Sequence, residues 1–230
     1  MPERDGRTLP ALVNSQMTFY ELRAPDYGDR SKPSDRLGRD SRGVRVDRAL
    51  MDEFRPEGDV LEIACGTGSF TAELVRHARS VTALDSSPSM LALNAQRVGD
   101  ARVRYLHRNV FTWVPDRLYD VVFFANWLSH VPPSMLDEFW GLVRLCLGPG
   151  GRVGFVDETP RASALDETQL VGGVPTARRT LGDGRQFDVV KVFWDPADLR
   201  DRLRALGWAI DLRPLGETCM FGSGRYVGTA

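Results

Sequence analysis

The stretch DVLEIACGTG, residues 59–68, joins a short apolar run to a turn that holds two glycines. Val60–Ile63 has the length and the apolar character of a buried strand. Gly66 and Gly68 supply the turn, and residues 70–77 then have helical spacing. A strand, a glycine turn and a helix in this order are typical of the first unit of a parallel α/β sheet.

Further strands and helices alternate downstream of this unit. Ser87 is a candidate N-cap with Pro88 at the first helical position, which predicts a helix over 88–98. A second helix is expected over 134–147, ending at a glycine-rich turn. The expected strands are 80–84, 103–106, 121–124 and 153–156. This alternation predicts a parallel sheet with right-handed crossovers.

The alternation breaks after Asp157. Residues 178–181 and 186–193 flank Gly182-Asp183-Gly184, a pattern that predicts a β-hairpin. A helix is expected over 196–206, with further strands at 208–212 and 219–227. We therefore predict one domain with four parts: a helical N-terminal flap and loop (1–58), an α/β core (59–157), a hairpin insertion (158–194), and a C-terminal helix with strands (195–230).

The composition limits the classes of partner. Hydrophobic residues make up 42% of the 230 residues and the formal net charge is −1, so no overall basic field favours nucleic acid or an anionic membrane. No apolar run has the length of a membrane span, and the first ten residues contain no secretory apolar segment. The cysteines at 65, 146 and 219 are widely spaced, which favours a reducing compartment. We expect a cytoplasmic monomer or homodimer without a metal site, because only three histidines occur and no paired Cys/His spacing does.

The glycine turn and an acidic residue after the second strand predict a nucleoside site. In doubly wound sheets, ligands bind outside the carboxyl ends of the strands, where an acid such as Asp85 can accept from ribose hydroxyls. The dinucleotide fingerprint is absent, because Ala64 and Phe70 stand where its first and third glycines would be sought. A charge at Glu62 disfavours a pyrophosphate but suits an ammonium group. The alternative is a structural one: the glycines only form a turn and Asp85 only caps the next helix.

This set of motifs resembles the class I S-adenosylmethionine-dependent methyltransferases. The similarity covers residues 60–68, Asp85, the segment after the fourth strand, and residues 147–151. The resemblance implies a Rossmann-like α/β fold: a mostly parallel seven-stranded sheet with helices on both faces, plus an inserted β-hairpin and an N-terminal helical flap. It also implies S-adenosyl-L-methionine as the cofactor.

The resemblance assigns roles residue by residue. The methionine part would be lined by Glu62, Ala64 and Gly66. Asp85 and Ser86 would hold the ribose, with Met90 in the next helix. Asn109, Val110 and Phe111 would border the adenine, although many members carry aspartate where Asn109 stands. Ala125 and Trp127 follow the fourth strand, near the sulfonium. In the flap, Tyr20, Arg23 and Tyr27 match a Y-x-x-R-A-x-x-Y pattern in which the arginine pairs with the cofactor carboxylate; for the tyrosines, packing of an amphipathic helix is the alternative.

Two elements carry the candidate acceptor site. His130 lies in the segment after the fourth strand, where it serves as a general base, as a hydrogen-bonding group, or only as a loop residue. We expect His77 and His107 to be structural. The hairpin gathers Arg178, Arg179, Arg185 and Lys191, and guanidinium groups match the oxygens of acids. By charge alone, a solvated charged hairpin is the favoured explanation of these cations.

A closer resemblance favours an acid-binding hairpin. Residues 81–85, 122–132 and 178–193 are similar to the phosphonate O-methyltransferases of the dehydrophos antibiotic pathway. The resemblance implies that Arg179 and Lys191, with Arg178, bind the acid group of the acceptor and that His130 lies near it. One departure concerns the loop after the flap, where the relatives use a tyrosine and the stretch around Ser34 has none.

Together these observations predict an O-methyltransferase for a small acidic metabolite, a phosphonate or a carboxylate, in natural-product biosynthesis. The catalytic candidates are His130, Arg179 and Lys191. Two alternatives remain: a methyltransferase for an amine or hydroxyl group with His130 as general base, and a protein that binds the cofactor without catalysis.

Overall fold

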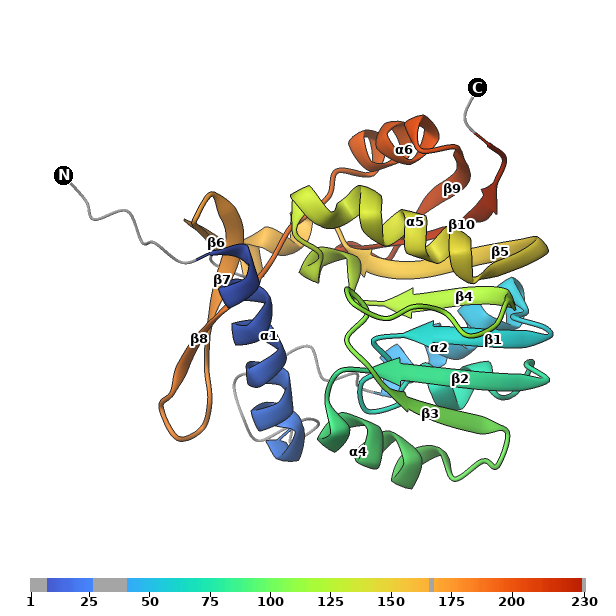
Figure 1. Cartoon of the computed structure of the whole chain (residues 1–230), viewed down its shortest axis with the longest axis horizontal. Coiled ribbons are helices and arrows are strands. Elements are labelled where there is room, and N and C mark those ends of the chain that lie inside the picture. The colour runs from blue at the N-terminus through green and yellow to red at the C-terminus, as the bar shows by residue number, and fades with distance from the viewer. Residues whose placement is uncertain (1–7, 27–40, 166–167, 229–230) are drawn as a thin grey trace.

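The computed structural model describes residues 8–26, 41–165 and 168–228. At its centre lies a seven-stranded sheet with the strand order β3-β2-β1-β4-β5-β10-β9 (Figure 1). The strands are β1 (Asp59–Ile63), β2 (Ser80–Asp85), β3 (Val103–His107), β4 (Tyr119–Ala125), β5 (Leu147–Glu158), β9 (Trp208–Leu215) and β10 (Cys219–Tyr226). The first five pair in parallel, whereas β10 runs antiparallel to both β5 and β9. The predicted mostly parallel sheet is confirmed.

The strand order reverses between β1 and β4. Chain segments β2 and β3 extend the sheet on one side of β1, and β4 and β5 extend it on the other. Residues 121–124 are buried on both faces, as their apolar character predicts for a central strand. A reversal of this kind opens a crevice at the carboxyl ends of the strands, which is where ligands bind in such sheets.

Helices cover both faces of the sheet. Against one face lie α5 (Leu136–Cys146) and α6 (Pro196–Ala205), and there the ring of Phe124 stacks on Phe155 with centroids 5.3 Å apart. Against the other lie α2 (Ser41–Phe54), α3 (Thr71–Leu74) and α4 (Pro88–Val98), with Phe70 and Phe123 5.0 Å apart. Buried aromatic side chains of this kind each stabilise a fold by about 3–5 kcal/mol.

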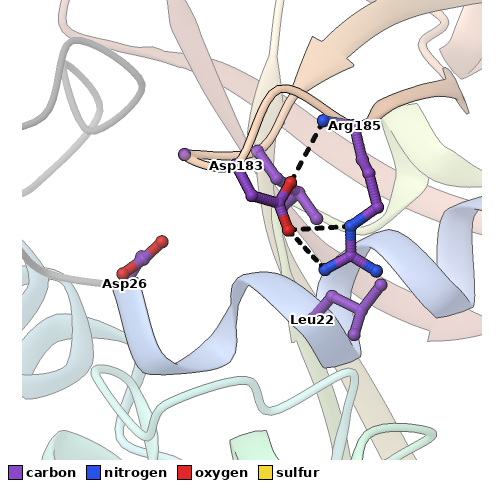
Figure 2. A pocket seen from close by; sticks show the side chains of 6 residues that line it. Leu22, Asp26, Asp183 and Arg185 are labelled. Carbon is purple, nitrogen blue, oxygen red and sulfur yellow. Dashed lines mark hydrogen bonds and ion pairs between the residues drawn. The ribbon is translucent and has the colours of Figure 1, made fainter.

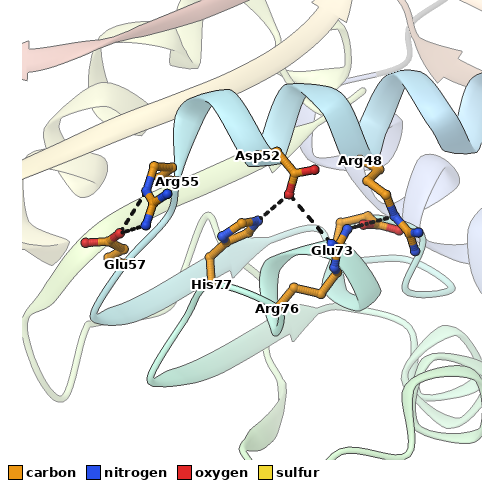
Figure 3. Close-up of polar contacts among 7 residues, drawn as sticks. All are labelled: Arg48, Asp52, Arg55, Glu57, Glu73, Arg76 and His77. Atoms are coloured by element: carbon orange, nitrogen blue, oxygen red, sulfur yellow. Dashed lines mark hydrogen bonds and ion pairs between the residues drawn. The ribbon is translucent and has the colours of Figure 1, made fainter.

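Helix α3 is shorter than the helix expected over 70–77. Its last turn tightens, because the N–H groups of Arg76 and His77 bond three residues back, to the carbonyls of Glu73 and Leu74. A polar network joins this segment to α2 (Figure 3). The buried Glu73 carboxylate accepts from Arg48 and Arg76, and His77 Nε2 lies 2.9 Å from Asp52 Oδ1. These contacts fix α2 over the start of the sheet.

The flap and the hairpin form a second layer at the carboxyl edge of the sheet. Helix α1 (Leu9–Arg23) continues into the short η1 (Ala24–Asp26), and the arrowheads of β1, β2 and β4 point towards it in Figure 1. The hairpin consists of β7 (Val174–Thr180) and β8 (Gln186–Val190), in the predicted pairing. Phe19 of α1 packs against Leu181 and Val189 of this hairpin. The predicted flap and hairpin therefore pack against each other beside the crevice.

One further strand was not expected. Strand β6 (Thr168–Val171) pairs with β7, which makes the insertion a three-stranded antiparallel sheet. The connection is Gly172-Gly173, and both residues have positive φ, at 56° and 81°. Two glycines between apolar runs are a known signal for a two-residue hairpin turn. In the described part of the chain, no helix is long and apolar enough to cross a membrane.

Candidate active site

The residues that directly follow β1 and β4 have backbone φ angles in the left-handed region. Ala64 has φ 53° and Asn126 has φ 52°, although neither is a glycine. Such a conformation costs about 1–2 kcal/mol for an L-residue and is concentrated at functional sites. Two of them at neighbouring strand exits therefore mark the crevice between β1 and β4.

The turn after β1 is open on the side where a ligand would lie. Gly66 has φ 51°, and a Cβ built there meets no atom within 4 Å. A Cβ at Gly68 would lie 2.5 Å from Asn94 Oδ1, so this position tolerates only glycine. The turn therefore packs closely against α4 at Gly68 and leaves free space at Gly66.

Glu62 is a buried acid beneath this turn. Its side chain, on a residue only 3% exposed, accepts from Thr71 Oγ1 at 2.5 Å, and Thr71 Oγ1 in turn accepts from Asn94 Nδ2 at 2.8 Å. Burial raises the pKa of Glu62 to about 8, against the effect of the Thr71 hydrogen bond, and the negative charge of Asp85 adds to the rise. The protein without a cation at this point therefore holds Glu62 mostly protonated at neutral pH.

Asp85 ties the end of β2 to the glycine turn. Its Oδ2 accepts from the Gly66 N–H at 2.9 Å, and its Oδ1 accepts from the Ser87 N–H at 2.9 Å. A carboxylate has about four acceptor positions, so both oxygens keep capacity for further donors. Burial raises the pKa of Asp85 despite these two bonds. Ser87 is the N-cap of α4, as predicted, because its hydroxyl accepts from the Met90 N–H at 3.0 Å.

The segment after β3 lies between the crevice and α5. Asn109 Oδ1 accepts from the Phe111 N–H at 3.0 Å, which makes this side chain an organiser of its own turn. The rings of Phe111 and Trp127 are 5.6 Å apart, and the buried indole N–H of Trp127 has no hydrogen-bond partner within the described residues. Val110 and Phe111 also line an open groove of about 480 Å³ along α5.

The flap is fastened to α4 by Glu21, a residue that the sequence did not single out. Its carboxylate accepts from the hydroxyls of Ser87 at 2.6 Å and Ser89 at 2.5 Å, and from the Ser89 N–H at 3.2 Å. Burial opposes ionisation of Glu21, but these hydrogen bonds outweigh it and lower the pKa of its carboxyl. The attachment holds α1 beside Asp85 and the N-terminus of α4.

Tyr20 of α1 contacts His130 of the loop that follows β4. The Tyr20 hydroxyl lies 2.9 Å from His130 Nε2, and His130 Nδ1 lies 2.7 Å from the carbonyl oxygen of Val190. Because a carbonyl only accepts, Nδ1 carries the proton and Nε2 accepts from Tyr20. Burial lowers the pKa of His130 to about 3, and positive charges at Lys191, Arg179 and Arg23 contribute. The imidazole is therefore neutral at neutral pH.

Lys191 is a buried cation next to His130. The residue is 4% exposed, and its ammonium contacts the Glu158 carboxylate and lies 3.4 Å from Ser129 Oγ. The backbone fixes its position, since Lys191 N–H donates to Pro175 O at 2.9 Å and Val192 N–H donates to Ser129 O at 2.8 Å. The end of β8 is thereby joined to the loop that follows β4.

The hairpin arginines do not act as one group. Arg178 is half exposed, and its Nε lies 3.1 Å from Asp188 Oδ1, whereas Arg179 belongs to the positive charges that reach His130. Neighbours on a strand point to opposite faces, which separates these two side chains. Arg185 pairs with Asp183 in the hairpin turn, facing Leu22 and Asp26 of the flap across an open groove of about 340 Å³ (Figure 2).

The structure thus separates the predicted site residues into groups. Around the exits of β1 and β2 it brings together Glu62, Ala64, Gly66 and Asp85, with Ser86 and Met90 adjoining. Around the exit of β4 it brings together Tyr20, His130 and Lys191, with Ala125 and Trp127 on the same loop. Tyr27 lies outside the described residues. Within the described ranges, no group of three or more His, Cys, Asp or Glu side chains is arranged to hold a metal ion.

Comparison with known proteins agrees with this geometry. A family model described as a methyltransferase domain matches residues 60–151. The structure of DhpI with SAH has a TM-score of 0.81 and 37% identity, over 96% of this chain and 99% of that chain. The complex of DhpI with SAM and HEP has the same TM-score and 38% identity, over 95% and 100%. An uncharacterized methyltransferase of Mycobacterium tuberculosis is 28% identical over 167 residues, which is 69% of this chain and 83% of the relative. The chain therefore belongs to the class I S-adenosylmethionine-dependent methyltransferases, and S-adenosylmethionine is its methyl donor.

Proposed function

We propose that this enzyme transfers the methyl group to an oxygen of a small acidic metabolite. The observation that carries the proposal is the buried Lys191 ammonium beside His130 and Ser129, at the loop that leaves β4. A buried cation beside the loop that leaves a central strand is suited to an anionic ligand. The likeness to DhpI, solved with SAM together with a second compound, HEP, supports a small-molecule acceptor.

The residues at β1 and β2 fit the cofactor. Free space over Gly66 allows close approach of a ligand to the backbone, and the buried Glu62 carboxyl can lose its proton to an ammonium group placed beside it. We assign Asp85 to the ribose hydroxyls and Arg23 to the carboxylate of the methionine part. When bound, S-adenosylmethionine supplies a methyl group on a positively charged sulfur.

The acceptor side needs no general base. An ionised acid oxygen is already a nucleophile, so the protein has only to orient it and exclude water. We assign this orientation to Lys191 and Arg179. His130 is a poor base at neutral pH, because its pKa is about 3 and its Nε2 is engaged by Tyr20. Its contacts suit a residue that holds the flap against the hairpin.

The test is methyl transfer from labelled S-adenosylmethionine to a panel of phosphonates, carboxylates, amines and phenols. We expect label in acid esters, with a rate that has no basic limb in the histidine range. Label only in amines or phenols, together with a histidine limb that His130→Ala abolishes, would support the general-base alternative and contradict our proposal. Tight cofactor binding without any product would indicate a non-catalytic protein.

A second prediction concerns the protons of Glu62. Binding of S-adenosylhomocysteine is expected to release close to one proton at neutral pH. Without ligand the pKa of this carboxyl is about 8, so it holds a proton, and a neighbouring ammonium lowers the pKa and expels it. Calorimetric titrations in two buffers of different ionisation enthalpy measure the release. The Glu62→Gln variant is the control, and equal binding heats in both buffers for the wild type would contradict the assignment.

A further inference from the structure

Glu158 is a buried carboxylate that contacts the cation proposed to bind the acceptor. It is the last residue of β5, is 8% exposed, and meets the Lys191 ammonium directly. Its backbone is fixed, because Glu158 N–H donates to Asp157 Oδ1 at 2.8 Å and the residue pairs with Cys219 of β10. The carboxylate is therefore held at the carboxyl end of β5, in contact with Lys191.

The Lys191 ammonium has limited capacity for a ligand. An ammonium group has three N–H donors. Among the described residues, the hydrogen-bond acceptors at Lys191 are the Glu158 carboxylate and Ser129 Oγ, and the Phe193 ring centroid lies 5.1 Å from the nitrogen, so at most one N–H is left for an acceptor molecule. An acid that binds there must share the nitrogen with a carboxylate of the protein.

Other charged and titratable groups face the same point. Asp157 of β5 is buried, accepts from the Ser129 N–H at 3.1 Å, and lies close enough for the Lys191 charge to oppose the rise in its pKa that burial causes. His130 is neutral, and Arg179 and Arg23 add positive potential. Glu158 is the carboxylate in direct contact with the ammonium, so its charge has the largest effect on a second anion at the same nitrogen.

We propose that Glu158 is a positioning residue that limits the charge of the acceptor: by holding Lys191, it selects acids with a single negative charge over dianions. This inference rests on the proposed function. Because the Glu158 carboxylate offsets the charge of the Lys191 ammonium, a dianion gains little more from this pair than a monoanion does, and it costs more to transfer out of water. The preferred acceptors are therefore carboxylates and singly ionised phosphonates or their monoesters.

The experiment compares two probes that differ by one methyl group and by one negative charge. Ethylphosphonate and its monomethyl ester are titrated calorimetrically into protein saturated with S-adenosylhomocysteine, at a mildly alkaline pH where the free acid is largely a dianion. The wild type is expected to bind the ester more tightly. In Glu158→Gln, which keeps a hydrogen-bond acceptor for Lys191, the preference for the ester is expected to fall about tenfold, equivalent to about 1.4 kcal/mol. In Glu158→Asp, which keeps the charge, the preference should remain.

The controls separate this inference from the proposed function. Glu53→Gln removes the same charge from an exposed residue of α2 and should leave the preference unchanged. If Lys191→Met weakens both probes while Glu158→Gln leaves their ratio as in the wild type, the role of Glu158 is wrong and the acid-binding role of Lys191 stands. If the wild type binds neither probe and Lys191→Met changes nothing, the proposed function fails and this inference with it. The wild-type preference is itself a test that depends on no variant: tighter binding of the dianion would overturn the proposal.

Discussion

Replacing Asp85 by alanine is expected to weaken the binding of S-adenosylhomocysteine by about 100-fold or more. The side chain makes two hydrogen bonds in the ligand-free protein, to the Gly66 and Ser87 N–H groups, and we assign its remaining acceptor positions to the ribose. A hydrogen bond to a charged group is worth about 1.5–3 kcal/mol, so two lost ribose contacts reach this size. Asp85→Asn keeps one carbonyl oxygen and should show a smaller loss.

The thermal stability of the Asp85→Asn variant is expected to increase, although its affinity for S-adenosylhomocysteine decreases. Burial raises the pKa of Asp85 in the folded protein. A carboxyl group whose pKa is higher in the folded than in the unfolded protein stabilises the fold at a pH below its pKa in the unfolded protein. This stabilisation is lost as the pH rises through its pKa in the folded protein. Above its folded pKa the ionised Asp85 is therefore a cost, and the unfolding temperature of Asp85→Asn should rise relative to that of the wild type as the pH increases through this value. Asp116→Asn, at an exposed ion pair with Arg104, serves as the control for both measurements. Unchanged cofactor affinity in both Asp85 variants would contradict the assignment.

Replacing Lys191 by alanine is expected to lower kcat/KM for an acid acceptor by about 100-fold or more. The variant loses a charged hydrogen bond to the acceptor and also leaves Glu158 as a buried, unpaired carboxylate that repels it. Affinity for S-adenosylhomocysteine, measured by calorimetry, should stay close to the wild-type value, because the cofactor residues at β1 and β2 are untouched.

A double variant distinguishes the chemistry of Lys191 from its effect on folding. Breaking a buried ion pair by removing one partner costs about 3–5 kcal/mol, whereas removing both charges is often neutral. Lys191→Met with Glu158→Gln is therefore expected to recover the thermal stability that Lys191→Ala loses, yet to remain deficient in kcat/KM for acids. Recovery of activity together with stability would mean that Lys191 only supports the fold.

The sequence predicted the central sheet because its signals are local. An apolar run of four residues, a glycine turn and a capping serine each specify structure within a few positions, and Ser87, Asp85 and Gly66 lie where these signals indicate. The third strand of the insertion was missed although its signal, Gly172-Gly173, is equally local.

The polar contacts around the acceptor site have no local signal. Glu158 and Lys191 are 33 residues apart, Ser129 and Lys191 are 62 apart, and Glu21 meets Ser87 across 66. Only the packing of the flap and the hairpin on the sheet brings them together. The same holds for His130, whose low pKa depends on burial and on cations from three other segments. Strand alternation, by contrast, is a local rule and could have separated Arg178 from Arg179 in advance.

The most direct test of the account is a crystal structure of the protein with S-adenosylhomocysteine and the best acid acceptor found in the transfer assay. We expect the ribose hydroxyls at Asp85, the sulfur between the exits of β1 and β4, and the acid group within hydrogen-bond distance of Lys191 Nζ, with one acid oxygen facing the sulfur. An acid group that contacts neither Lys191 nor Arg179, with the cofactor bound as expected, would contradict the proposed acceptor site.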